Sequence, residues 1–168
     1  MMTESRYDIT DNGKVFRFKP NRYSIRLSVV VLAILIVLAL IFVYYYHETN
    51  QGLRVLFFIL VPYLIVHSMY DIFIRSEICY TFDKDSELIY RKVPFFSSKK
   101  LMSFDEAVIF ISRTNRYWYY SLGARKSHLV KSYRISEDFT DKADKSEKQI
   151  QYENVVLKKI YELLEYSK

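Results

Sequence analysis

Two long apolar runs in the first half of the chain constrain its fold more than any other feature. They extend from Leu27 to Tyr46 and from Val55 to Ile74, and a short polar segment joins them. Each run has about the ~20 residues that an α-helix needs to cross ~30 Å of hydrocarbon. The sequence therefore predicts a membrane α-helical hairpin, with transmembrane helices at 27–46 and 55–75.

The basic residues around the two runs predict the orientation of this hairpin. Residues 1–26 contain six Lys and Arg residues, whereas the joining segment, 47–54, contains only Arg54. Because loops rich in Lys and Arg stay on the cytoplasmic side, the N-terminus is expected there, and two crossings return the chain to the same side. We expect a multi-pass protein of a cell inner (plasma) membrane with both termini cytoplasmic and 47–54 as a short outer loop.

A cytoplasmic β-hairpin is predicted in residues 1–26, before the first run. Residues Tyr7–Thr10 and Val15–Phe18 have alternating patterns, and Asn12-Gly13 lies between them. Asn-Gly is the strongest short hairpin signal because both residues tolerate a positive φ angle.

After the second run the pattern changes to the period of two that is typical of β-strands. Six segments combine aromatic and β-branched residues and are separated by turn-prone stretches. They are Ile78–Phe82, Leu88–Val93, Lys100–Ser103, Ala107–Ser112, Arg116–Leu122 and His128–Ile135. Strands this short and this closely spaced predict a small antiparallel β-barrel or sandwich.

A C-terminal amphipathic helix is predicted from Ser146 to Tyr166. Ser146 and Gln149 fit a capping box, and five apolar residues repeat on one helical face. These are Val156, Leu157, Ile160, Leu163 and Leu164. We expect this helix to cover the open end of the β domain, because an apolar face needs a surface to bury it. The preceding segment, 137–146, is highly charged, which predicts a solvated linker or a poorly ordered loop.

This order of elements resembles bacterial membrane proteins in which a two-helix hairpin accompanies a pleckstrin-homology-like (PH-like) domain. The resemblance covers residues 76–168 and is one of topology. It implies a cytoplasmic β-rich module closed by the C-terminal helix. The outline also resembles the two-transmembrane β-barrel effectors of cyclic-oligonucleotide anti-phage systems, which implies nucleotide binding followed by assembly and membrane disruption.

Four polar side chains lie on one face of the second run. Tyr63, His67, Asp71 and Arg75 follow one another at four-residue spacing. An ionisable residue at mid-bilayer costs ~3 kcal/mol or more, so such residues are functional candidates. Two interpretations stay open. The row is either an intramembrane polar seam, or an interfacial Asp71–Arg75 pair with His67 bonded within the hairpin.

Basic and aromatic residues alternate around the predicted strand at 116–122. The candidate ligand- or headgroup-binding residues are Lys99, Lys100, Arg113, Arg116, Tyr119, Arg125 and Lys126. Cations can pair with phosphate while a ring stacks on a base. The alternative is an ordinary hairpin with one buried face, because alternation separates Tyr117 and Tyr119 from Trp118 and Tyr120.

The segment from Phe95 to Lys100 combines two phenylalanines with two lysines. This composition suits docking on an anionic leaflet, where aromatic and cationic side chains act together. A turn with a buried phenylalanine accounts for the same residues, so both interpretations stay open.

The sequence contains no enzyme signature. It has three glycines, none in a phosphate loop, and neither CxxC nor HExxH spacing. We therefore expect a non-enzymatic protein without cofactor or metal.

Three functions remain open at this stage. The first is a partner- or ligand-binding regulatory module at the membrane, whose candidate partners are the lipid bilayer, a protein, a cyclic nucleotide and a second copy of the chain, with no DNA or RNA. The second is an effector that oligomerises on nucleotide binding and disrupts the membrane. The third is a membrane immunity protein against a toxin.

Overall fold

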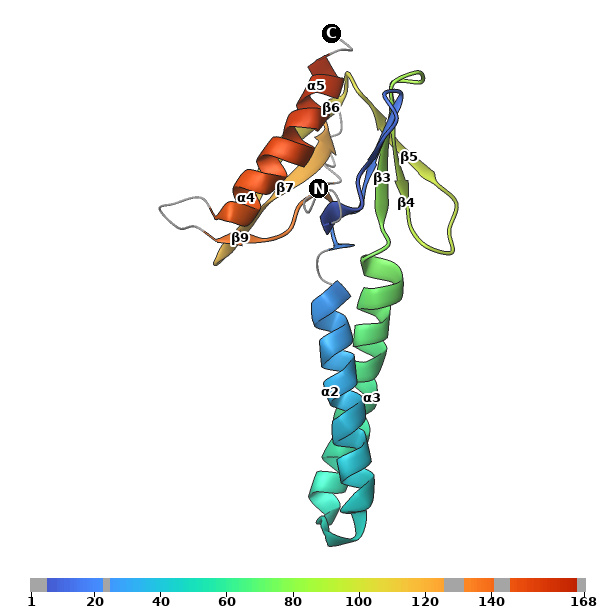
Figure 1. Ribbon diagram of the computed structural model, residues 1–168, viewed down its shortest axis with the longest axis vertical. Coiled ribbons are helices and arrows are strands. Elements are labelled where there is room, and N and C mark those ends of the chain that lie inside the picture. The colour runs from blue at the N-terminus through green and yellow to red at the C-terminus, as the bar shows by residue number, and fades with distance from the viewer. Residues whose placement is uncertain (1–5, 23–24, 126–131, 141–145, 166–168) are drawn as a thin grey trace.

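Two long apolar helices project from a β-rich domain in the computed structural model, which describes residues 6–22, 25–125, 132–140 and 146–165 (Figure 1). They are α2 (Ile25–Tyr44) and α3 (Gln51–Tyr70), and a π-helical segment, η3 (Asp71–Arg75), continues α3. Both helices are long and apolar enough to cross a membrane. The pair of helices that the two apolar runs predict is therefore present.

The two helices pack as an antiparallel hairpin, and a short 3-10 helix, η2 (Tyr46–Glu48), lies in the turn that joins them. The Asn50 side chain caps α3 by accepting a hydrogen bond from the Leu53 amide at 2.8 Å. Near this turn the rings of Phe42 and Phe57 stack with their centroids 3.7 Å apart. The stacked rings hold the two helices together at the end farthest from the β domain.

The first sheet combines strands from both sides of the helical hairpin. Its order is β1 (Thr10–Asp11), β2 (Val15–Phe18), β3 (Cys79–Asp83), β4 (Leu88–Lys92) and β5 (Lys99–Ser103), all antiparallel. The N-terminal hairpin forms β1 and β2, and β2 pairs with β3, with Phe18 opposite Tyr80. The segments before α2 and after η3 are thus neighbours in one sheet.

The second sheet is built around one long hairpin. It contains β6 (Ala107–Thr114) and β7 (Tyr117–Ala124), and two short strands, β8 (Tyr133–Arg134) and β9 (Phe139–Thr140), pair with opposite parts of β7. Of the predicted strand at 128–135, residues 128–131 lie outside the described residues, and the remainder contains β8.

The expectation of a solvated linker at 137–146 is wrong for its first part. Glu137 is buried, and Phe139 lies in β9 with its ring 5.0 Å from that of Trp118. Burial of Glu137 is offset by a charge partner far away in sequence, because Arg6 Nη2 donates to Glu137 Oε2 at 2.9 Å and the Tyr7 hydroxyl donates to Oε1 at 2.6 Å. Burial and this hydrogen bond raise the pKa of Tyr7 far above its usual range.

The C-terminal helix is continuous over α4 (Glu147–Tyr152), the π-helical η4 (Glu153–Leu157) and α5 (Lys158–Glu165). Ser146 caps it by accepting a hydrogen bond from the Gln149 amide at 3.3 Å. The helix lies along β6 and β7 (Figure 1), and its apolar face shares one core with both sheets. The core-forming residues of this face include Val156, Leu157, Ile160 and Leu163, as the spacing predicts.

Candidate functional site

The candidate site lies at the end of the β domain where the long helices join it, which we call the helix end. Strand β3 begins at Cys79, soon after η3, and Cys79 is paired with Lys92 at the end of β4. The loop that follows Lys92, 93–98, therefore emerges at the helix end. Figure 1 shows this loop and the turn between β6 and β7 on opposite sides of the helical hairpin, both at the edge of the β domain from which the helices extend.

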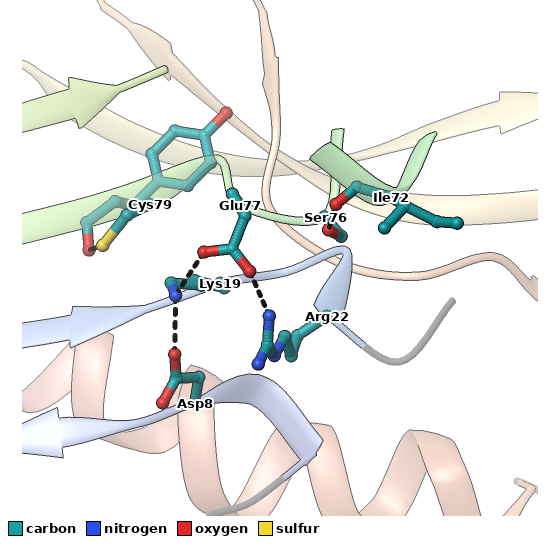
Figure 2. A network of polar contacts seen from close by, with 8 residues as sticks. Asp8, Lys19, Arg22, Ile72, Ser76, Glu77 and Cys79 are labelled. Atoms are coloured by element: carbon teal, nitrogen blue, oxygen red, sulfur yellow. Dashed lines mark hydrogen bonds and ion pairs between the residues drawn. The ribbon is translucent and has the colours of Figure 1, made fainter. Parts of the chain in front are cut away.

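A cluster of ion pairs holds the helix end together (Figure 2). We call Asp8, Lys19, Arg22 and Glu77 the base cluster. Lys19 Nζ lies 2.7 Å from Asp8 Oδ2 and 2.7 Å from Glu77 Oε2, and Arg22 forms an ion pair with Glu77. The hydrogen bond from Lys19 holds the pKa of Asp8 below its usual range. Burial acts to lower the pKa of Lys19, but its two carboxylate partners outweigh it and the pKa is raised. Both groups therefore stay charged near neutral pH.

The 93–98 loop exposes two aromatic rings. Phe95 is 87% exposed and Phe96 is 71% exposed. Phe95 also has a φ angle of 65°, in the left-handed region that bulky residues rarely adopt. The interpretation of this segment as a turn with a buried phenylalanine is therefore wrong, and the exposed arrangement that membrane docking requires is present.

The two lysines that follow this loop are both exposed and lie on opposite faces of β5. Lys99 is opposite Arg91, and Lys100 is opposite Tyr90. Arg91 and Lys99 line a pocket at the helix end, whereas Tyr90 lines a groove on the outer face of the first sheet. Lys99 and Lys100 thus belong to two different surfaces.

The predicted basic residues of the second sheet do not form one cluster. Arg113 and Arg116 are exposed at the β6–β7 turn, beside the exposed ring of Tyr117. Arg125 follows the other end of β7, roughly 23 Å away along a strand of this length. Lys126 lies outside the described residues.

The aromatic residues of β7 divide between two faces, as alternation predicts. Trp118 and Tyr120 pack against Phe139 with ring centroids 5.0 and 6.2 Å away, so they belong to the core. Tyr119 faces the other way and lies under the Arg134 guanidinium at 4.7 Å. The rings of this strand that face the core are therefore unavailable for stacking on a base.

The polar row on α3 and η3 forms a chain of contacts. His67 Nδ1 lies 3.6 Å from Asp71 Oδ2, and Arg75 Nη1 lies 3.5 Å from Asp71 Oδ1. The Tyr63 and His67 rings are 6.3 Å apart. Tyr63 is 63% exposed and the His67 side chain is 55% exposed, so the deeper half of the row lies on the outside of the hairpin.

No metal centre or activated thiol occurs in the part of the chain that the structure describes. No three His, Cys, Asp or Glu residues of that part come close enough to share a metal ion. Burial raises the pKa of Cys79, which keeps its thiol protonated and poorly nucleophilic.

Sequence reasoning missed Arg91 and Tyr133, which line the pocket beside Lys99. A signal was available in the alternation of the β4 segment. Ile89 is buried in the core, and Val93 packs against it. Arg91 lies midway between them and therefore on the same inward face.

Comparison of the chain with protein-family models, with curated proteins and with solved structures gives no match in any of the three.

Proposed function

We propose that this chain is a non-enzymatic inner-membrane protein whose β domain is a binding module held against the membrane surface. In this proposal α2 and α3–η3 cross the bilayer, and both termini lie in the cytoplasm. The proposed architecture of the β domain is PH-like, and its support is that two antiparallel sheets share a core with a C-terminal helix. The helical hairpin is inserted between its strands β2 and β3.

The observation that carries the proposal is the arrangement of the helix end. Two projections, the 93–98 loop and the β6–β7 turn, flank the helical hairpin (Figure 1). Each combines exposed aromatic residues with cations. Phe95 and Phe96 precede Lys99 in the first projection, and Tyr117 lies beside Arg113 and Arg116 in the second. With the hairpin in a bilayer, both projections lie near the headgroups.

The energetics of the interface favour this placement. Tyrosine is enriched at membrane interfaces, and phenylalanine rings bury their apolar surface at the boundary between headgroups and acyl chains. Each Lys or Arg near an anionic leaflet adds about 1 kcal/mol of attraction. The base cluster and the β2–β3 pairing hold the domain at the end of the hairpin, so docking of the two projections fixes its orientation.

Tryptophan quenching in the reconstituted full-length protein tests this proposal. Trp118 is the single tryptophan of the chain, so Trp118→Phe provides a protein without tryptophan fluorescence. In that background, Phe96→Trp places a tryptophan in the loop and Asp85→Trp places one at the far end of the first sheet. The vesicles contain phosphatidylglycerol and phosphatidylcholine that is brominated in the upper part of its acyl chains.

We expect strong quenching of the tryptophan introduced at position 96 and little quenching of the one introduced at position 85. Equal quenching at the two positions contradicts docking of the loop. Insertion is measured separately by alkaline extraction and by protease protection of the C-terminal region. A chain that is extracted at alkaline pH contradicts the membrane-spanning hairpin.

The outward position of Tyr63 and His67 favours a second candidate function. Polar side chains that face lipid are stabilised when a neighbouring helix covers them, so the row suits self-association of the hairpin and a ligand-triggered, membrane-disrupting assembly. Induced expression in cells with a membrane-impermeant dye separates the two functions. Dye entry that His67→Leu abolishes supports the effector, and an intact membrane supports the binding module.

A further inference from the structure

A pocket of about 560 Å³ opens between the two sheets at the helix end. Two cations and two hydroxyl groups line it, together with apolar side chains from the 93–98 loop and the strands beside it. The residues that matter here are Arg91, Lys99, Ser97, Tyr133, Val93 and Phe96. No carboxylate is among the described residues that line it, so its walls carry a net positive charge.

The position of the two cations in this pocket destabilises the protein when no ligand is bound. Arg91 and Lys99 are direct cross-strand partners on β4 and β5. Like charges in this position repel each other and destabilise a sheet. Neither residue forms an ion pair with any residue that the structure describes. The like-charged pair therefore lacks a counter-charge within the described chain.

The Arg91 guanidinium is also incompletely bonded. Its Nε atom is buried and has no hydrogen-bond partner among the described residues, while its Cζ lies 5.8 Å from the Tyr133 ring centroid. Buried donors in folded proteins almost always have a partner. An oxyanion in the pocket would supply the negative charge that this guanidinium and Lys99 lack.

We propose that this pocket binds a phosphate ester, and that its source is the headgroup of an anionic phospholipid. Arginine pairs with phosphate through parallel hydrogen bonds, and lysine adds a point charge. Phe96 lines the pocket and exposes its ring at the same edge, so a lipid can place its phosphate beside Arg91 and its glycerol against the ring. The choice of lipid as the source rests on the proposed function, whereas the phosphate chemistry rests on the pocket itself.

The chain contains its own matched control. Lys92 and Lys100 adjoin Arg91 and Lys99 in sequence and lie on the opposite face of the same two strands. The double variants R91Q/K99Q and K92Q/K100Q therefore remove the same charge from the same strands, but only the first alters the pocket. The single variant K99Q, at an exposed residue, serves where R91Q/K99Q fails to fold.

The experiment is isothermal titration calorimetry of the full-length protein in dodecyl maltoside. The probes are dihexanoyl phosphatidylglycerol, dihexanoyl phosphatidylcholine and inorganic phosphate. We expect phosphatidylglycerol to bind more tightly than phosphatidylcholine, with affinity at least about tenfold lower in R91Q/K99Q and within about twofold of the unmodified chain in K92Q/K100Q. Equal losses in the two double variants, or no preference for phosphatidylglycerol, overturn the proposal.

Inorganic phosphate identifies the source of the ligand. Binding as tight as that of phosphatidylglycerol, with the same loss in R91Q/K99Q, overturns the lipid source and assigns the pocket to a soluble phosphate compound. Weaker binding of inorganic phosphate supports the lipid. Because the titration takes place in detergent, its failure is distinct from a failure of membrane insertion or of loop docking, which are measured in vesicles.

Discussion

Lys19, which precedes the first long helix, and Glu77, which follows the second, form an ion pair with Nζ and Oε2 2.7 Å apart. The contact closes the base of the helical hairpin against the β domain (Figure 2). Strand pairing between β2 and β3 makes the same connection through the backbone. A relative movement of the two helices at their base therefore has to break contacts within the β domain.

Removal of the Glu77 carboxylate, which Lys19 and Arg22 share, should weaken the junction between the helical hairpin and the β domain. Glu77 accepts hydrogen bonds from Lys19 and Arg22, so Glu77→Ala is expected to lower the free energy of unfolding by about 1–2 kcal/mol. Asp85→Ala is the control, because the Lys14–Asp85 pair also joins the N-terminal hairpin to the β3–β4 turn but is exposed to solvent. We expect a loss below about 0.5 kcal/mol there. Denaturant unfolding in detergent measures both, and equal losses mean that the base cluster has no special role.

The buried Glu137 should depend strongly on its partner at the N-terminus. Arg6→Met leaves a carboxylate, whose side chain is only 4% exposed, without its cation, and a loss of about 3 kcal/mol is expected. Adding Glu137→Gln removes the uncompensated charge. The double variant R6M/E137Q should then be more stable than R6M alone in thermal unfolding. A double variant that is less stable than R6M contradicts the assignment of Arg6 as the compensating charge.

Stability should fall at alkaline pH because tyrosines are buried in the core. Burial raises the pKa of Tyr80 to about 12, from about 10 in the unfolded chain. The folded state therefore keeps a proton that the unfolded state loses, so this contribution is complete below pH 10 and is lost as the pH rises toward 12. Each such tyrosine lowers the free energy of unfolding by up to about 1.4 kcal/mol per pH unit in this range. Tyr80→Phe should make the decline in the free energy of unfolding between pH 10 and 11.5 shallower by up to the equivalent of one proton. An unchanged slope contradicts the raised pKa of Tyr80.

The regular elements of this fold were predictable because each has a local pattern. Apolar length predicts α2 and α3, alternation predicts most strands, and one apolar face predicts the C-terminal helix. The β2–β3 pairing is not local, since the whole helical hairpin separates its two strands. Glu137 was misassigned for the same reason, because its charge partner, Arg6, is 131 residues away.

The candidate site was only partly predictable, because side-chain direction and strand register decide which cations meet. Adjacent lysines, Lys99 and Lys100, read as one patch in sequence but face opposite ways in β5. The register of β4 and β5 also shifts at an irregularity between Ile89 and Tyr90, and this shift sets Arg91 opposite Lys99. No single-strand pattern predicts such a shift.

The backbone conformation of Phe95 affects both the stability of the protein and the proposed docking of the 93–98 loop. Its φ angle of 65° is unfavourable for a side chain that is 87% exposed and therefore gains little from packing. Such a conformation costs a non-glycine residue about 1 kcal/mol or more. Phe95→Gly relieves this strain, and we expect a gain of about 0.5–1 kcal/mol in the free energy of unfolding.

The same substitution should weaken docking, because it removes one of the two exposed rings of the loop. Combined with W118F/F96W, Phe95→Gly is expected to reduce quenching by brominated lipid while the protein becomes more stable. Glu87→Gly is the matched control, since Glu87 also has a positive φ angle, 52°, but lies at the far end of the first sheet. It should give a similar gain in stability with unchanged quenching. If Phe95→Gly likewise leaves quenching unchanged, the Phe95 ring does not enter the interface, and its strained conformation requires another explanation.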